Sequence, residues 1–387
     1  MAQTRLAVLD GLRGIAVLLV LWYHIWEISW LPAPLARLQF VPETGFVGVD
    51  LFFYISGFVI VYPFVKALLH REAPPTWAHF AYRRAIKIVP SYVLCICVLI
   101  AIGYAHFASA GEAARDIVTH LLFIHTWWGD TAGTINGVLW TLAVEVQFYA
   151  LFPVIWWLFS RNPWTTSAVM IVAAIAFRSY GQACCLHTTA GLMLENLPSY
   201  LDTFAFGMLS AYMYVSWRER IHSGGQRIGA TLAALAGFVA LTLLLQNLWA
   251  MRTAPDWSTV WQIHNRTLLG ASFLLIGLGS LLSVRAWQRI VGNPVLLFMG
   301  VISYNLYLYH QAFARELLAW RIPPYNGADQ HGDPHWEFTY TIVAFVLTIA
   351  QAALVTYAFE RPLLRIPMER WQRWWSRTRR AGALSGM

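Results

Sequence analysis

Four side chains that can carry charge lie in one apolar stretch near the N-terminus: Asp10, Arg13, His24 and Glu27. Such groups are costly in hydrocarbon, so within a membrane-spanning helix they face protein or a water-filled cavity and indicate a functional site. A helix advances about 100° per residue, which returns His24 to nearly the same face as Arg13, roughly 16 Å along the axis. Asp10 and Glu27 lie close to that face as well. The four residues therefore form one stripe, which is either a structural salt-bridge ladder or part of a reactive site.

The chemistry that this stripe permits centres on His24. Unperturbed imidazole titrates at about pH 6.5, so it can take up and return a proton under neutral conditions. A carboxylate such as Glu27 can hold the ring in one tautomer and stabilise the imidazolium. His24 is therefore a candidate general base and Glu27 its partner. An acyl-histidine intermediate is also chemically possible, and the sequence leaves both routes open.

The composition places these residues in a membrane protein. Of the 387 residues, 58% are apolar and only 12% are charged, which is about half the charge of a soluble domain. The 20 Trp and 17 Tyr suit the aromatic belts of membrane proteins. We expect an all-α, polytopic bundle of about ten transmembrane helices. The N-terminus does not resemble a cleavable signal, because Asp10 and Arg13 interrupt the apolar run and no small-residue cleavage site follows.

The predicted spans are apolar runs of about the length that a bilayer requires. They lie near residues 7–30, 46–66, 86–108, 136–159, 164–181, 197–217, 227–249, 266–284, 294–318 and 337–360. A further apolar stretch, 117–128, is expected to be re-entrant or interfacial. Residues 1–360 are expected to form one transmembrane domain, and residues 361–387 a basic cytoplasmic tail.

The basic residues orient this bundle. Most of the 27 Lys and Arg fall on one side when the N-terminus is placed inside, and the positive-inside rule assigns that side to the cytoplasm. Both termini are then cytoplasmic, and the net charge of +8 reflects topology and does not indicate nucleic-acid binding. Arg178 and Arg266 are among the few basic residues that would fall outside. His24 would lie in the outer half of the membrane and Arg13 at the cytoplasmic mouth.

Five segments hold most of the other notable side chains. In chain order they are Asp10–Gly14 (DGLRG) with His24, Gly48–Phe58 (GVDLFFYISGF), Arg83–Pro90 (RRAIKIVP), Trp140–Tyr149 (WTLAVEVQFY) and Ser303–His310 (SYNLYLYH). Together, and in this order, they resemble the acyltransferase 3 family of integral-membrane acyltransferases over nearly the whole chain. Lys87 departs from the family pattern, which usually has a second arginine there, and Thr141 stands where serine is common.

The resemblance implies a reaction and a donor site. The family transfers acyl groups, commonly acetyl from acetyl-CoA, to hydroxyls of sugars and other acceptors at the membrane. Arginine pairs well with phosphate, so Arg83, Arg84 and Lys87 are candidates for binding the CoA phosphates, and Arg13 for binding the deeper part of the acyl-CoA. Lysine lacks the bidentate fork of arginine, so the contact of Lys87 would be looser. The alternative for these cations is that they only set topology.

Glu145 is a further catalytic candidate, which would bind the acceptor or position His24 unless it serves helix packing. Other residues expected at the acceptor or behind the catalytic groups are Asp10, Asp50, Ser56, Trp140, Tyr304 and His310. A helix N-terminal cap is the alternative for Asp50, and ordinary packing is the alternative for the aromatic residues. The four cysteines do not have zinc-site spacing. We therefore expect no metal and no tightly bound cofactor, with acetyl-CoA or another acyl-CoA as donor substrate.

Three classes of function remain open. The leading one is a multi-pass O-acyltransferase of the inner (plasma) membrane, with a carbohydrate or glycosylated acceptor such as a surface polysaccharide, a lipid-linked sugar or a glycosylated metabolite. A proton-coupled transporter would use the Asp, Glu and His groups as a relay, although no inverted repeat is visible. A non-catalytic partner in polysaccharide export is the third. Some family members carry an appended extracytoplasmic domain, whose role a separate partner protein would take here unless the acceptor reaches the membrane cavity itself.

Overall fold

The structure is a computed structural model that describes residues 6–325, 330 and 332–367. Over these residues the chain forms helices joined by turns and loops, without a strand, which confirms the all-α prediction. Most of the predicted basic tail, residues 368–387, lies outside the described residues.

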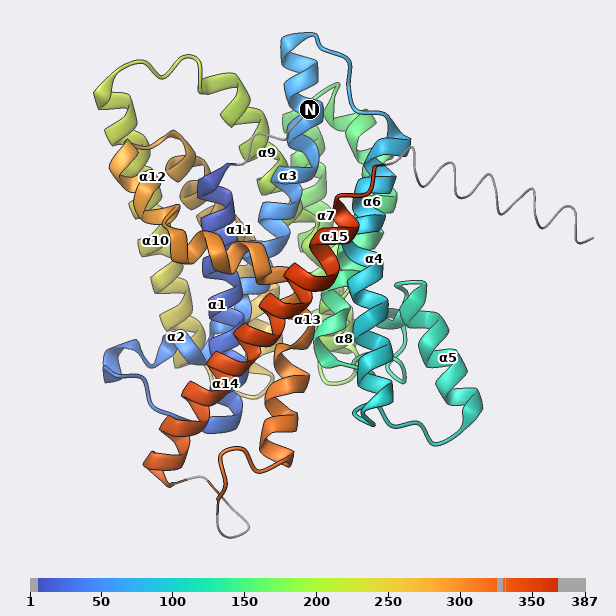
Figure 1. Cartoon of the computed structure of the whole chain (residues 1–387). Coiled ribbons are helices and arrows are strands. Elements are labelled where there is room, and N and C mark those ends of the chain that lie inside the picture. Colours follow the sequence, from blue (N-terminus) through green and yellow to red (C-terminus); the bar gives the residue numbers. More distant parts are fainter. Residues whose placement is uncertain (1–5, 326–329, 331, 368–387) are drawn as a thin grey trace, which may run out of the picture.

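The long helices run side by side as a bundle (Figure 1). They are α1 (Ala7–Ser29), α3 (Gly48–His70), α4 (Trp77–Ala101), α6 (Trp140–Phe159), α7 (Pro163–Cys185), α9 (Leu201–Trp217), α10 (Gly224–Ala250), α11 (Trp257–Leu282), α13 (Pro294–Ala319) and α14 (Pro334–Val355). The shorter helices are α2 (Phe40–Glu43), α5 (Ala110–Leu121), α8 (Ala190–Leu194), α12 (Arg285–Val291) and α15 (Arg361–Leu364). The stretch 117–128 forms the end of α5 and a 3-10 turn at His125–Trp127.

Within the described residues, eight helices are long and apolar enough to cross a membrane, or nine if α12 and α13 form one span. These two helices meet at a bend of 46°. Helix α9 has 17 residues, which is near the lower limit of about 17 residues for a span. The chain is thus a multi-pass membrane protein. The count of about ten spans and the cytoplasmic location of both termini stay predictions.

Short capping sequences set where the helices beside the site begin. The side chain of Asn293 accepts hydrogen bonds from the backbone N–H groups of the first turn of α13, and Pro294 occupies the first helical position. Asp333 and Pro334 start α14 in the same way. An Asn or Asp cap satisfies N–H groups that lack partners within the helix, and proline is well suited to the position after it. Helix α13 carries His310, and the residue at which this helix starts is therefore set by the local sequence.

Glycines bring α1 into backbone contact with its neighbours. A Cβ atom at Gly14 would lie 2.2 Å from the carbonyl oxygen of Leu296, and one at Gly300 would lie 2.1 Å from that of Asp10. Gly48 of α3 meets α1 equally closely. Small residues permit such close approach between membrane helices, where dispersion contacts drive association. Helix α1 is consequently held between α3 and α13.

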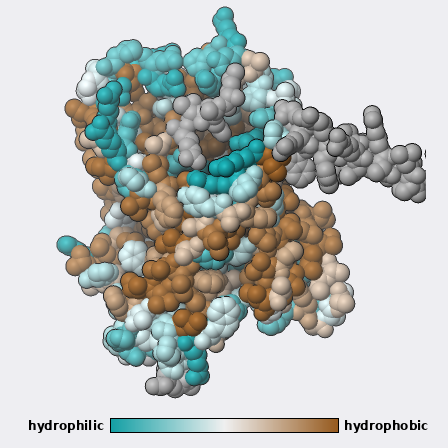
Figure 2. Space-filling view, viewed as in Figure 1, coloured by the Kyte–Doolittle hydropathy of each residue, from teal (hydrophilic) through white to brown (hydrophobic). Residues whose placement is uncertain are grey.

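The outside of the bundle is apolar over its middle. Figure 2 shows hydrophobic residues gathered across the central part of the visible face, with hydrophilic residues concentrated toward the two ends. Large aliphatic side chains such as Val154, Val172 and Leu354 are more than 60% exposed. Exposed apolar surface of this extent suits contact with lipid chains.

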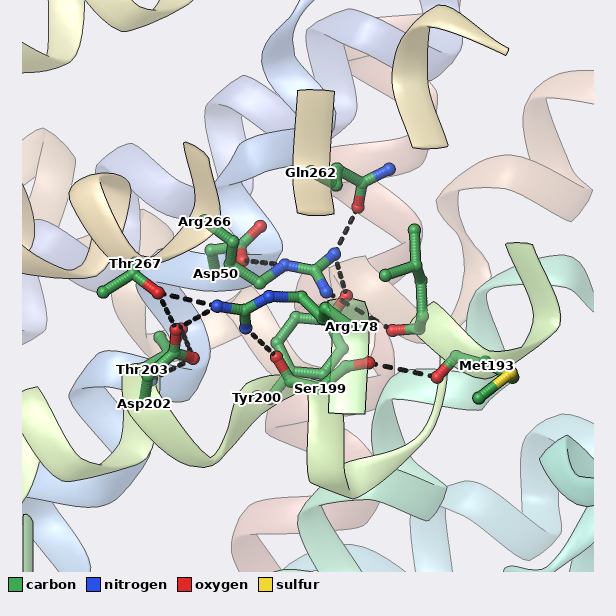
Figure 3. A network of polar contacts seen from close by, with 11 residues as sticks. Asp50, Arg178, Met193, Ser199, Tyr200, Asp202, Thr203, Gln262, Arg266 and Thr267 are labelled. Atoms are coloured by element: carbon green, nitrogen blue, oxygen red, sulfur yellow. Dashed lines mark hydrogen bonds and ion pairs between the residues drawn. The ribbon is translucent and has the colours of Figure 1, made fainter. Parts of the chain in front are cut away.

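Arg178 and Arg266 are buried, which their sequence context did not indicate. The sequence counts both among the outer basic residues, which stays a prediction, and the structure places them within α7 and α11, only 1% exposed. Figure 3 shows the two guanidinium groups side by side, Arg178 with Asp202 and Arg266 with Asp50. They escaped recognition because each stands at the edge of an apolar run, where a buried arginine and a loop arginine have the same sequence context.

Candidate active site

A first cavity of about 280 Å³, which we call the cationic cavity, opens among α1, α3, α4, α6 and α13. It collects residues that are far apart in the chain. The site residues predicted from sequence that line it are Arg13, Ser56, Arg83, Arg84, Lys87, Glu145 and Tyr304. The tertiary structure thus brings together four cations and one carboxylate at a single cavity.

The cations of this cavity differ in how they are paired. Arg13 forms an ion pair with Asp10, with 3.3 Å between Nη1 and Oδ1. Lys87 forms an ion pair with Glu360, a buried residue beyond α14 whose other carboxylate oxygen accepts a hydrogen bond from Asn305. Lys87 is therefore already engaged with a carboxylate of the protein.

Arg84 is less satisfied than these two cations. Its Nε is buried and has no hydrogen-bond partner among the described residues. Its guanidinium lies 5.8 Å from the centre of the Tyr149 ring. A buried donor without a partner is costly, so a ligand with anionic oxygens would gain from binding beside Arg84.

Glu145 is held by hydroxyl groups in the wall of the cationic cavity. Its carboxylate accepts hydrogen bonds from the Ser56 hydroxyl, at 2.5 Å, and from the Tyr149 hydroxyl. Glu145 and Ser56 come from α6 and α3, so this contact joins two helices across the cavity. Glu145 lines a different cavity from His24.

A second cavity of about 330 Å³, which we call the histidine cavity, is lined by His24 and Glu27 together with Gln311 and Arg315 of α13. It shares no lining residue with the cationic cavity. Gln311 and Arg315 were not among the predicted site residues. Their i,i+4 spacing directly after His310, which puts them on one helix face, is the signal that could have found them.

His24 and His310 contact each other at the edge of this second cavity. The hydrogen-bond partners of the two rings define their tautomers. His310 Nδ1 lies 2.8 Å from the carbonyl oxygen of Tyr307, which can only accept, so Nδ1 carries the hydrogen and Nε2 a lone pair. His24 Nδ1 lies 2.9 Å from the carbonyl oxygen of Val20 and 3.0 Å from His310 Nε2. His24 Nδ1–H therefore donates to these two acceptors. In the neutral ring, His24 Nε2 then retains its lone pair, which is the state that a general base requires.

Glu27 lines the same cavity as His24, but the His24 Nδ1 hydrogen bonds go to other residues. The Tyr23 hydroxyl donates to Glu27, and Arg315 interacts electrostatically with both Glu27 and His24. The sequence assigned the tautomer of His24 to Glu27, but in the structure His310 and the Val20 carbonyl hold the Nδ1 hydrogen.

Comparison with known proteins gives this arrangement a family. A protein-family model described as an acyltransferase domain, of the acyltransferase 3 type, matches residues 6–357. The chain belongs to the acyltransferase 3 family. The matched region contains the histidine pair and every residue that lines the two cavities except Leu364.

Related proteins of this family occur in Staphylococcus aureus. The chain is 26% identical over 328 residues to a protein of strain COL named as a candidate O-acetyltransferase, covering 79% of this chain and 50% of that protein. It is 23% identical over 326 residues to O-acetyltransferase OatA of strain NCTC 8325 / PS 47, covering 78% of this chain and 49% of OatA. The chain thus spans about half the length of the curated relatives it matches. No solved structure matches it.

The remaining predicted residues of this acyltransferase domain lie behind the cavity walls. Asp50 is buried beside Arg266, with 3.1 Å between Oδ1 and Nε. Trp140 stacks on Tyr200, whose ring also carries the Arg266 guanidinium at 4.0 Å. Phe53, which lines the cationic cavity, contacts Tyr200 with its ring edge at 4.5 Å between centres. Asp50 and Trp140 therefore belong to a layer that supports the cavity from outside.

Ligand groups for a metal are not gathered in the part of the chain that the structure describes. No three of its His, Cys, Asp and Glu residues come close enough together to hold an ion.

Just outside the long helices, burial raises the pKa of Glu195 to about 7, although nearby Arg266 acts in the opposite direction. Glu195 belongs to the same supporting layer as Asp50.

Proposed function

We propose that the protein is a membrane-embedded O-acyltransferase that moves an acyl group, acetyl from acetyl-CoA, to a hydroxyl of a sugar-containing acceptor. The single observation that carries this proposal is the histidine pair, which leaves His24 with a lone pair on Nε2 beside a polar cavity. Membership of a family of acyltransferases supports the reaction class. The two relatives named O-acetyltransferases, one of them only as a candidate, support oxygen as the accepting atom.

The cationic cavity suits the donor. CoA presents phosphate groups, and charge-assisted hydrogen bonds from arginine to phosphate are among the strongest in proteins. In this proposal Arg83 and Arg84 bind phosphate, Arg84 through its Nε–H, a donor that the described residues do not satisfy. Arg13 lies deeper and faces the remainder of the acyl-CoA, while Lys87 balances Glu360.

The histidine cavity suits the acceptor. His24 Nε2 takes the proton of the acceptor hydroxyl as its oxygen attacks the carbonyl carbon of the thioester. The new C–O bond forms, the C–S bond breaks, and the departing thiolate receives the proton back from His24. His310 accepts the hydrogen bond from His24 Nδ1 throughout and so keeps the imidazole oriented as its charge changes. Glu27, Gln311 and Arg315 offer hydrogen bonds to the other groups of the acceptor.

The same arrangement supports a proposal for the acceptor class and the location. A polar cavity with acceptors and donors suits the hydroxyls of a surface polysaccharide, a lipid-linked sugar or a glycosylated metabolite. We place the protein in the inner (plasma) membrane, where cytoplasmic acyl-CoA can reach the cationic cavity. Where the final acceptor lies beyond the membrane, a separate extracytoplasmic protein would complete the transfer.

The test is release of CoA thiol from acetyl-CoA in inverted membrane vesicles, with sugar acceptors present and absent. We expect His24→Ala to lower the rate by about 10²- to 10⁴-fold, the range for loss of a general base. His222→Ala, which changes an exposed loop histidine, is the matched control and should keep the wild-type rate. Equal rates in wild type and His24→Ala, with acetyl-CoA bound by neither, would reject this proposal and favour the transporter.

A further inference from the structure

A layer of aromatic rings connects the wall of the cationic cavity with His24 of the histidine cavity. Phe52 of α3 and Tyr307 of α13 both line the cationic cavity, and their rings meet edge to face with 6.0 Å between centres and an interplanar angle of 74°. The Tyr307 ring lies 5.6 Å from that of His310, which in turn contacts His24 of the histidine cavity. A continuous row of rings therefore leads from the wall of one cavity to the base in the other.

The two members of this layer are not equally constrained. The Tyr307 hydroxyl donates to the carbonyl oxygen of Val138 at 3.2 Å, and the Tyr307 carbonyl accepts from His310. The Tyr307 ring is thus anchored through its hydroxyl and is only 7% exposed. Phe52 is half-buried and offers no polar atom for such anchoring. Of the two rings, Phe52 is therefore the one that can be reshaped without disturbing the histidine pair.

The position of this layer matters for the transfer. Arg13 and His24 lie roughly 16 Å apart along α1, so a thioester that enters beside Arg13 must approach Nε2 of His24 past the rings. The acceptor oxygen is activated only where that nitrogen can take its proton. The acyl carbon must therefore come within bonding distance of a hydroxyl on the far side of Phe52 and Tyr307.

We infer that Phe52 and Tyr307 form the wall that limits the size of the acyl group, with Phe52 as the specificity-determining residue. The inference rests on the proposed function. Rigid aromatic walls around an apolar group discriminate by size, and one methylene more or less in such a site changes kcat/KM by roughly 10- to 200-fold. The wall thus selects a short aliphatic acyl group over its longer homologues.

The experiment compares radiolabelled acetyl-, propionyl- and butyryl-CoA as donors. The membranes are prepared from the source organism, so they contain its own acceptors. Each preparation carries either the wild-type protein or one variant. Alkali-labile label in the acceptor fraction reports ester formation. The measured quantity is the ratio of the butyryl to the acetyl transfer rate, which cancels differences in protein amount.

Opposite changes at Phe52 should move this ratio in opposite directions. Phe52→Ala should raise it by about tenfold or more, and Phe52→Trp should lower it. Phe338→Ala is the matched control, because Phe338 is a 58% exposed aromatic residue of α14 that lines neither cavity. It should keep the wild-type ratio.

The outcomes distinguish a failure of this inference from a failure of the proposed function on which it rests. If wild type transfers label but Phe52→Ala and Phe52→Trp both keep its ratio within twofold, the wall is not at Phe52 and only the inference fails. If wild type transfers no label from any acyl-CoA, the proposed function itself fails. Should Phe52→Ala not accumulate, Phe52→Leu replaces it and must raise the ratio in the same direction.

Discussion

Charged side chains are placed in two regions of this bundle, and the regions differ in how those charges are treated. On the side of α7, α9 and α11, Arg178 and Asp202 form an ion pair with both side chains 0% exposed. On the side of α1, α4 and α13, the side chains of Arg13 and Asp10 are 30% and 24% exposed at the mouth of a cavity. One region seals its charges within protein, whereas the other keeps them accessible.

This difference separates structural from reactive groups. Burying charges is tolerable only when each has a partner and further hydrogen bonds, and Arg178 meets this condition through Asp202, Thr267 and a backbone carbonyl. Arg178 Nε has no hydrogen-bond partner among the described residues either, but it lines neither cavity. Arg84 and His24 differ in that each keeps a donor or a lone pair without a partner beside a cavity. Incomplete pairing beside a cavity, and not charge alone, is therefore what identifies the candidate site.

The largest effect is expected when the buried ion pair between Arg178 and Asp202 is broken. Arg178→Met should destabilise the protein by about 3–5 kcal/mol, because it leaves the Asp202 charge buried without its partner. Arg13→Met should cost less than about 1 kcal/mol, since the Arg13 pair is exposed to the cavity. Detergent-induced unfolding measures both. Equal losses for the two variants would remove the distinction between the regions, and the double change Arg178→Met with Asp202→Leu should recover part of the lost stability.

The next effect concerns the positioning residue His310. His310→Ala should lower kcat by about 100-fold with an unchanged KM for acetyl-CoA, because the His24 ring loses its orienting acceptor. His310→Gln should recover part of the rate, since the glutamine side-chain oxygen can accept from His24 Nδ1–H. Steady-state kinetics with both variants separates the two parameters. A rise of KM without a fall of kcat would contradict the assigned role.

A smaller effect is expected at the cationic cavity. Arg84→Met should raise the KM for acetyl-CoA about tenfold or more, which corresponds to the loss of a hydrogen bond to a charged group, and should leave kcat nearly unchanged. Arg227→Met, at a half-buried residue in the first turn of α10 that lines neither cavity, is the matched control. The KM of the wild type should also rise with salt. A KM for Arg84→Met equal to that of the control would assign Arg84 to topology alone.

The smallest expected effect concerns His125, a buried histidine that lies outside the long helices and belongs to neither of the two regions. Burial first, and the neighbouring His120 second, lower the pKa of His125 to about 3. The unfolded chain binds this proton at about pH 6.5, so as pH falls below that value stability should drop by about 1.4 kcal/mol per pH unit. His125→Phe keeps a ring stacked on His120 and should remove this contribution. Unfolding at about pH 7.5 and about pH 5.5 measures it, and identical slopes for both proteins would count against it.

Features that depend on neighbours along the chain were predictable. Apolar runs predicted a multi-pass helical protein, and helical spacing placed Arg13 and His24 on one face of α1, where they line two successive cavities. The assignments that changed involve distant partners. The sequence names Glu27 as the partner of His24, whereas in the structure His24 Nδ1 contacts His310 of α13. The sequence treats Arg266 as an outer basic residue, and the structure pairs it with the buried Asp50.

By itself the sequence determined that this protein folds in a lipid bilayer, that it is helical, and that its first helix carries a polar stripe. These follow from hydropathy and from the local periodicity of backbone hydrogen bonding, both of which act over a few residues. Only the tertiary structure decided which groups meet: His24 contacts His310 across 286 positions, and Lys87 meets Glu360 across 273. Such pairings depend on where Gly14, Gly48 and Gly300 allow helices to touch. They also set the layer of aromatic rings that connects the two cavities.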